Sequence, residues 1–198
     1  MSARRPSRLA TTLRCGVLVA ALTAASACTT AGSDATGDNG YVSGDGSITV
    51  IDPADRKPAP TIQGPKLGGG TLDTSAYADE TVVLNIWGSW CGECRGEAAD
   101  LAAASKLLRK DGVVFVGLDT RDRDSLAEAY VRRFDIPYPS LVDQDSRLLL
   151  DFYGIVSPNA IPSTLVIDSD GKLAAVITGP TTKDTLVDLV GDVQQSTS

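Results

Sequence analysis

The chain alternates short continuous apolar runs with stretches in which apolar residues recur at helical spacing. Residues 81–87 and 113–118 are continuous, β-branched runs of the kind that forms buried strands. Between them, residues 92–110 place leucine and alanine at helical spacing and end at Asp111-Gly112. Because two strands joined by a helix lie parallel, these three segments predict a parallel pair of strands with a helix packed on the sheet.

The rest of the chain predicts a smaller set of elements around this unit. They are a second amphipathic helix, a short strand, a short helix, an antiparallel hairpin and a closing helix, over residues 124–134, 140–143, 147–152, 165–167 with 172–178, and 182–190. An Asp-Gly turn joins the two arms of the hairpin. Parallel and antiparallel pairs together predict an α/β fold with a central mixed sheet flanked by helices.

The first 27 residues predict an export signal that is not part of the fold. Four arginines without an acidic residue precede a small, apolar run over residues 15–27. This run is shorter than the roughly 18 apolar residues that a stable membrane-spanning helix needs. Ala25-Ser26-Ala27 leads directly into Cys28 and resembles the lipobox of bacterial lipoproteins, in which the cysteine becomes the lipid-carrying N-terminus. Ordinary cleavage near Ala27 with an incidental Cys28 is the alternative, and Arg4-Arg5 matches a twin-arginine signal only weakly.

A polar segment separates this signal from the folded part. Residues 29 to about 46 consist of small and polar residues with almost nothing to bury, which is typical of a flexible tether. We therefore divide the chain into a lipoprotein signal peptide (1–27), a tether and N-terminal extension (28–57) and a globular domain (58–195). Export and a lipid on Cys28 would place the domain on the outer face of the cytoplasmic membrane.

The composition excludes several classes of chemistry. The chain has no histidine, so Ser-His and Cys-His nucleophile pairs, imidazole zinc sites and haem held by a proximal histidine are ruled out. With 18 Lys and Arg against 25 Asp and Glu, the formal net charge is −7. Since nucleic-acid binding needs a basic surface, nucleic acid is not an expected partner.

The cysteines isolate one reactive pair. Cys15 leaves with the signal and Cys28 would carry the lipid, so only Cys91 and Cys94 remain, as a single CxxC. A tetrahedral zinc site would need two further ligands, and no metal is expected. A purely structural disulfide is the alternative, but so short a loop removes little unfolded-state entropy. At a strand end and helix start, unpaired amides favour a thiolate on the first cysteine, which indicates a redox-active pair.

The residues around this pair resemble a known family. The segment Trp90-Cys91-Gly92-Glu93-Cys94-Arg95 is similar to the active site of the thioredoxin superfamily, and in particular to membrane-tethered thiol-disulfide reductases of the ResA/TlpA type. The likeness extends over about residues 58–192. Further stretches that are similar to the family are Ala59-Pro60 with the turn at 68–72, Glu97, the loop and strand from 154 to 168, and Asp170-Gly171-Lys172.

The resemblance implies a thioredoxin-like fold and a role for each site residue. Cys91 would exchange disulfides with a client and Cys94 would resolve the mixed disulfide. Pro162 would be cis and lie close to the sulfurs, and Glu97 would relay the proton of the buried thiol. The client would contact Trp90, Gly92, Glu93 and the backbone of Ile161. An ordinary loop proline and an exposed helical glutamate remain the alternatives for Pro162 and Glu97, and Trp87 is expected in the core.

The segment departs from the family at two points. Glu93 stands where the superfamily usually has proline before the second cysteine, and Ala98-Ala99 replaces a helical proline. We hypothesise that the negative charge of Glu93 raises the pKa of the Cys91 thiol and makes the pair more reducing.

The resemblance also implies clients and partners. The protein would need no cofactor besides the Cys91–Cys94 pair. It would act on protein disulfides as a monomer, keep the cysteines of apocytochrome c reduced, and be re-reduced by a membrane electron donor of the CcdA/DsbD type. An exported disulfide oxidase or repair enzyme is one alternative, and a non-catalytic thioredoxin-fold binding module is another. A CxxC pair does not favour peroxide reduction.

Overall fold

The computed structural model describes residues 40–43 and 46–197. The predicted signal peptide, Cys28 and the first part of the tether lie outside the described residues. The strands are β1 (Gly40–Ser43), β2 (Gly46–Val50), β3 (Gln63–Pro65), β4 (Thr71–Asp73), β5 (Thr81–Trp87), β6 (Val113–Thr120), β7 (Ser140–Asp143), β8 (Ser163–Ile167) and β9 (Leu173–Thr178). The helices are α1 (Gly92–Leu108), α2 (Asp124–Phe134), α3 (Arg147–Leu150) and α4 (Lys183–Thr197), with single 3₁₀ turns at Thr74–Tyr77 and Arg109–Asp111.

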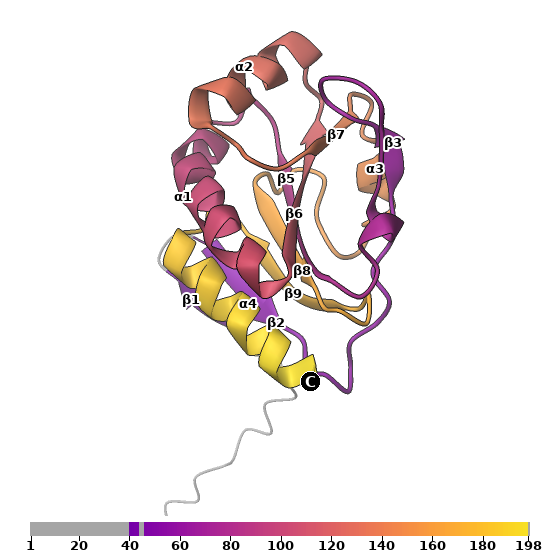
Figure 1. The fold of residues 1–198 in the computed structure, drawn as a ribbon, viewed down its shortest axis with the longest axis vertical. Coiled ribbons are helices and arrows are strands. Elements are labelled where there is room, and N and C mark those ends of the chain that lie inside the picture. Colours follow the sequence, from indigo (N-terminus) through magenta and orange to yellow (C-terminus); the bar gives the residue numbers. More distant parts are fainter. Residues whose placement is uncertain (1–39, 44–45, 198) are drawn as a thin grey trace, which may run out of the picture. The chain divides into compact units, whose positions relative to one another are not determined.

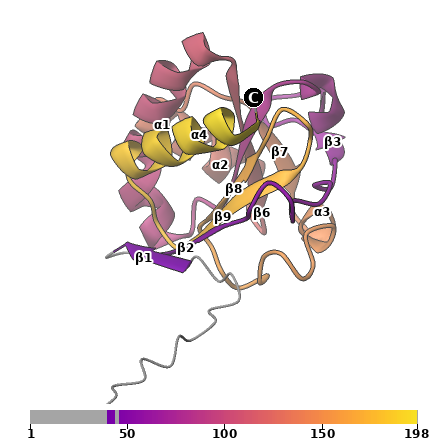
Figure 2. The ribbon, with the colours of Figure 1, turned by 90° about the horizontal axis from the view of Figure 1, so that it is seen from below.

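One mixed sheet forms the centre of the described part, as predicted. Its strand order is β1-β2-β9-β8-β5-β6-β7, and a separate two-stranded hairpin is formed by β3 and β4. Strands β5, β6 and β7 are parallel, whereas β8 runs antiparallel to both β5 and β9. Helices α1, α2 and α4 lie on one side of the sheet and α3 on the other (Figures 1 and 2).

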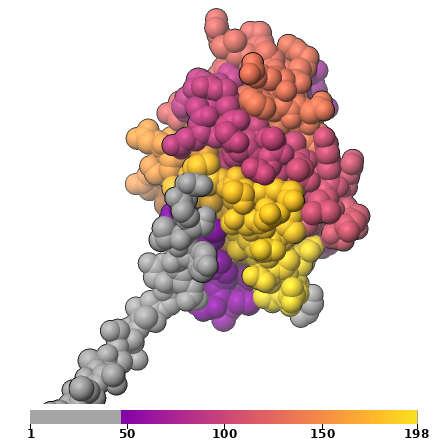
Figure 3. Space-filling model, turned by 90° about the vertical axis from the view of Figure 1, so that its left-hand side faces the viewer, coloured from indigo at the N-terminus to yellow at the C-terminus, as the bar shows by residue number. Residues whose placement is uncertain are grey.

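The side chains on the two faces of β5 pack into two different hydrophobic clusters. Val83 points to the face covered by α1 and α4, where it packs with Leu101 and Leu186. Its neighbours Val82 and Leu84 point to the opposite face and pack there with Leu149 and Phe152, among others. Burial on both faces explains why this strand reads as a continuous apolar run rather than an alternating one. On the α1 and α4 side, the two helices lie next to each other at the surface (Figure 3).

The chain before residue 58 contributes to the sheet. Residues 47–50 of β2 pair antiparallel with residues 175–178 of β9, and Ile48 is buried in the core under α4. Arg56 is buried as well, where it donates to Asp168 at 3.1 Å and to Ser196 at 2.7 Å. The globular part therefore begins before the predicted boundary, because β9 offers β2 a backbone edge that composition does not reveal.

Two further elements differ from the sequence prediction. The glycine turn at 68–70, where all three glycines have positive φ, joins the strands β3 and β4, which were not predicted. Helix α4 runs to Thr197, past the predicted end at 190, since Ser196 and Thr197 bond to Arg56. Within the described residues, no helix is both long and apolar enough to span a bilayer.

Candidate active site

The two predicted cysteines form a disulfide where β5 meets α1. Cys91 is the N-cap of α1, with extended backbone angles of φ −79° and ψ 121°, and its Sγ accepts the N–H of Cys94 at 3.0 Å. Cys91 is 5% exposed and Cys94 is 0% exposed. Of the two cysteines, only Cys91 therefore retains any exposed surface. In the reduced protein, the same N–H and the positive end of the helix favour a thiolate on Cys91.

The loop before β8 lies against Cys91. The Ile161–Pro162 peptide bond is cis, which confirms the prediction, and the carbonyl oxygen of Ile161 lies 3.7 Å from the Sγ of Cys91. The antiparallel pairing of β8 with β5 produces this contact, because it places Ser163 opposite Ile86 near the end of β5. The sheet thus brings together two segments that are about seventy residues apart in the sequence.

Glu97 is a buried carboxyl group rather than an exposed helical residue. It is 2% exposed, its Oε1 accepts from Nδ2 of Asn85 at 3.1 Å, and its Oε2 accepts from the backbone N–H of Thr181 at 2.9 Å. Burial raises the pKa of Glu97 to about 7, while these two hydrogen bonds lower it and the charge of Glu93 raises it further. Among the described residues, the hydrogen bonds of the Glu97 carboxyl group go to Asn85 and Thr181 and not to either sulfur, so the relay role of Glu97 stays a prediction.

The sequence alone does not predict Asn85 and Thr181 as partners of Glu97. Asn85 lies in the apolar strand β5, and its Nδ2 also contacts Oγ1 of Thr164 at 3.2 Å. Its position as a polar residue within a continuous apolar run is the feature of the sequence that could have identified it, since a buried amide needs hydrogen-bond partners. Thr181 precedes α4 and gave no such signal.

A pair of stacked aromatic rings supports the first turn of α1. The rings of Trp87 and Tyr130 stack with centroids 4.4 Å apart, and Trp87 is buried, as expected for a core residue. The hydroxyl group of Tyr130 donates to the carbonyl oxygen of Cys94 at 2.7 Å. Helix α2 therefore holds the backbone of Cys94, a role for Tyr130 that the sequence did not reveal.

Trp90 forms part of the surface beside Cys91. It is 47% exposed, its Nε1 donates to the carbonyl oxygen of Thr120 at 3.0 Å, and the guanidinium of Arg121 lies 5.0 Å from the ring centroid. Gly88 is required under this ring, because a Cβ there would clash with the indole. Arg95 donates to the carbonyl oxygen of Ser89 at 2.7 Å and so braces the same loop.

The other predicted client-binding residues surround the cysteines. Gly92 and Glu93 are exposed in the first turn of α1, and Ile161 is half-buried. Next to Trp90, a cavity of about 300 Å³ lies between α1 and α2 and is lined by both apolar and arginine side chains, including Leu126, Arg95 and Arg133. The surface is therefore hollowed beside Trp90, the residue that precedes Cys91.

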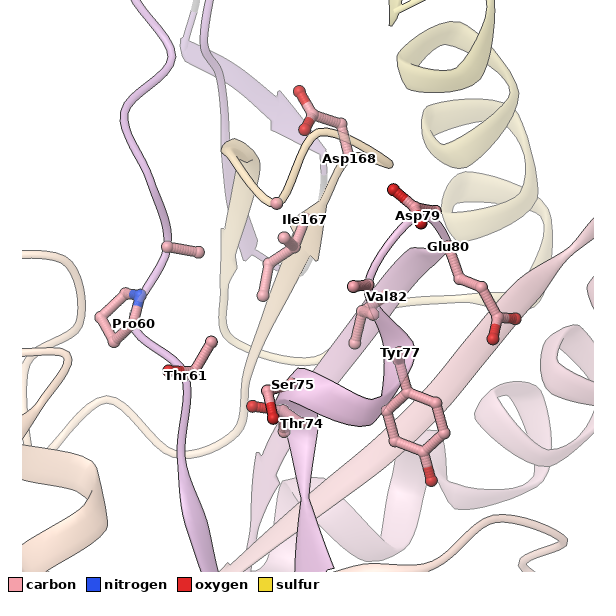
Figure 4. A pocket seen from close by; sticks show the side chains of 13 residues that line it. Pro60, Thr61, Thr74, Ser75, Tyr77, Asp79, Glu80, Val82, Ile167 and Asp168 are labelled. Atoms are coloured by element: carbon pink, nitrogen blue, oxygen red, sulfur yellow. The ribbon is translucent and has the colours of Figure 1, made fainter.

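Figure 4 shows the residues that line a second cavity, of about 180 Å³. Val82 at the start of β5 and Ile167 at the end of β8 line it together with Pro60 and Tyr77. Since Cys91 follows the opposite end of β5, this cavity is not part of the disulfide site. Among the described residues, no three acidic or cysteine side chains are grouped so as to hold a metal ion.

Comparisons with known proteins agree with this geometry. The family model described as "AhpC/TSA family" matches residues 56–176. The thiol-disulfide oxidoreductase ResA of Bacillus thuringiensis subsp. konkukian is 28% identical over 130 residues, which cover 66% of this chain and 73% of that protein.

Two solved structures are similar over most of the chain. A DsbF homologue from Corynebacterium diphtheriae superposes with a TM-score of 0.70 at 30% identity, over 79% of this chain and 99% of that one. A secreted thiol-disulfide isomerase from Corynebacterium glutamicum also has a TM-score of 0.70 at 30% identity, over 78% of this chain and 96% of that one.

Proposed function

This chain belongs to the AhpC/TSA family of the thioredoxin superfamily and is a thiol-disulfide oxidoreductase, and from this premise we propose that it is an exported reductase that keeps the haem-binding cysteines of apocytochrome c reduced. The observation that carries the redox chemistry is the Cys91–Cys94 pair at the start of α1, in which only Cys91 retains exposed surface and has the cis-proline loop against it. The similarity to ResA and the export signal support the choice of client and compartment.

Reduction of a client proceeds in two exchange steps. The Cys91 thiolate attacks one sulfur of the client disulfide, so that the client S–S bond breaks, a Cys91–client bond forms and the first client thiolate leaves. Cys94, after losing its proton, attacks the Sγ of Cys91, and the second client thiolate leaves. The protein ends with the Cys91–Cys94 disulfide, and two electrons have passed to the client, whose two thiolates take up protons.

The second step needs a proton acceptor inside the protein. Cys94 is fully buried, so bulk water cannot reach its thiol directly. Glu97 lies three residues further along the same helix, is buried, and has a pKa raised to about 7. A carboxyl group with a pKa near the working pH both accepts and returns a proton readily, and we assign this relay to Glu97.

The proposed location rests on the N-terminal sequence. Removal of residues 1–27 and lipidation of Cys28 would anchor the domain on the outer face of the cytoplasmic membrane. Because that compartment is oxidising, a reductase there needs a dedicated electron source. A membrane donor of the CcdA/DsbD type, attacking the disulfide at Cys91, would fill this role.

A second function is favoured by the solved structures. The relative from Corynebacterium glutamicum is called a secreted thiol-disulfide isomerase, and it matches this chain at 30% identity over nearly its whole length. The same cysteine pair, run in the opposite direction or used for rearrangement, would oxidise or repair exported proteins.

Two measurements separate these functions. The purified protein, reduced beforehand, should reduce a peptide that carries the disulfide-bonded C-x-x-C-H motif of c-type cytochromes, and Cys91→Ser should abolish this reaction. Thiol trapping in cells should find the pair mostly reduced. A mostly oxidised pair would contradict the reductase proposal and support the oxidase, and turnover unaffected by Cys91→Ser would contradict both.

A further inference from the structure

A carboxyl group that disulfide exchange does not use is buried behind the active-site loop. Asp119 lies near the end of β6, opposite Trp87 of β5, and is 1% exposed. Neither of its oxygens accepts a hydrogen bond from any donor among the described residues. A buried carboxylate without a donor is strongly destabilising, so Asp119 must either be neutral or have another partner.

The partner is a second carboxyl group, that of Asp122 three residues further along the chain, whose charge and side-chain hydrogen bond both raise the pKa of Asp119. Asp122 is also buried, but its oxygens accept two backbone N–H groups: Oδ2 that of Ser89 at 2.6 Å and Oδ1 that of Arg123 at 2.7 Å. Two carboxyl groups this close do not both ionise near neutral pH, so one of them keeps its proton.

The surroundings decide which one keeps it. Donors stabilise the charged form of Asp122, whereas burial and the negative charges of Asp122, Asp124 and Asp143 raise the pKa of Asp119 to about 8. The adjacent cations do not offset this: Arg121 donates to the carbonyl oxygen of Pro158 and lies over Trp90, and Arg123 is exposed.

Residues 119–122 also support the loop that leads to the reactive cysteine. Ser89 donates its N–H to Asp122, and the next residue, Trp90, donates its Nε1 to the carbonyl oxygen of Thr120. Cys91 follows directly. The position of this loop, and with it the approach to Cys91, therefore depends on where the carboxylate of Asp122 lies.

We propose that neutral Asp119 is a positioning residue that donates its O–H to Asp122 and so holds the Ser89–Trp90 loop, and that its ionisation in alkaline solution releases this loop and slows disulfide exchange at Cys91. Ionisation would place two negative carboxylates side by side in a buried site, and Asp122 would move away from Ser89. The effect on disulfide exchange rests on the proposed function, whereas the carboxyl pair itself does not.

The carboxyl pair of Asp119 and Asp122 is tested on the oxidised protein, in which neither cysteine titrates. We expect tryptophan fluorescence and the amide NMR signal of Ser89 to change together with a midpoint near pH 8, since both tryptophans of the chain flank this pair. Asp119→Asn, which stays neutral and still donates to Asp122, should abolish the transition. Asp188→Asn, the same change on an exposed position of α4, and Glu97→Gln should both retain it. A transition that persists in Asp119→Asn would overturn the proposal.

Activity provides the second readout. The rate of Cys91-dependent reduction in Asp119→Asn should equal that of the wild type near pH 6 and exceed it above pH 8, by up to about tenfold at pH 9, where about a tenth of Asp119 remains protonated. Equal rates at all pH values would contradict the positioning role. If the wild type shows no Cys91-dependent reduction, the proposed function is contradicted instead. The NMR titration would still show whether Asp119 and Asp122 form the proposed carboxyl pair.

A measurement on the wild type covers the case in which Asp119→Asn does not fold. The ¹³C signal of the Asp119 carboxyl carbon in aspartate-labelled oxidised protein should report a neutral group at pH 6 and a charged one above pH 9. A charged Asp119 at pH 6 would overturn the proposal.

Discussion

Replacement of Glu97 by glutamine tests the burial of the proposed proton relay. The pKa of Glu97 is about 7 in the folded protein and 4.5, its ordinary value, in the unfolded chain. Between these values the folded protein holds a proton that the unfolded chain has released, so the stability of the wild type falls as the pH rises from about 4.5 to about 7. Over that interval the free energy of unfolding of the wild type falls by about 3 kcal/mol. A protein with glutamine at position 97 does not show this fall, because glutamine does not ionise.

The substitution also has an effect that does not depend on pH. Asn85 and Thr181 each donate to one oxygen of Glu97, but glutamine has a single carbonyl oxygen. One buried donor then lacks its acceptor, which costs about 1–3 kcal/mol. We therefore expect Glu97→Gln to be less stable than the wild type at pH 4.5 and to equal or exceed it at pH 8.

The measurement is urea unfolding of the oxidised protein at pH 4.5, 6, 7 and 8, followed by circular dichroism. Glu128→Gln serves as the control, because Glu128 lies at the surface of α2 and its ion pair with Arg132 is exposed. The stability difference between this control and the wild type should stay within about 1 kcal/mol at every pH. If the difference between Glu97→Gln and the wild type is equally flat, the raised pKa of Glu97 and the relay argument built on it are wrong.

Three further substitutions test separate parts of the site and its support. Tyr130→Phe removes the donor to the carbonyl oxygen of Cys94 while keeping the ring, and should lower the free energy of unfolding by about 1–3 kcal/mol in the same urea assay. Glu93→Gln and Glu93→Pro both remove the negative charge beside Cys91 and should raise the reduction potential by about 30 mV, which corresponds to about 1.4 kcal/mol, in a glutathione redox titration; an unchanged or lower potential would contradict the charge argument. Arg56→Met leaves Asp168 buried without its cation and should destabilise the protein by about 3–5 kcal/mol, and a loss below 1 kcal/mol would show that this ion pair does not hold the N-terminal segment to the domain.

The sequence alone determined those elements whose local pattern of apolar residues specifies a strand or a helix. Residues 81–87 and 124–134 have the same bounds in the structure as in the prediction, because a continuous apolar run and an amphipathic period each specify one kind of element. The Cys91–Cys94 pair could also be placed from the sequence alone, since its spacing and its position between a strand and a helix are local features. The cis bond before Pro162 came only from the resemblance to a family.

The tertiary structure decided which polar groups are buried and what they contact. Glu97 meets the N–H of Thr181 across 84 residues of sequence, and Trp90 reaches the carbonyl oxygen of Thr120 across 30. The burial of Asp119 and the pairing of β2 with β9 likewise depend on neighbours contributed by other elements. Local composition specifies a residue's own preference for strand or helix, but the dielectric and the hydrogen-bond partners around a carboxyl group exist only after distant elements pack together.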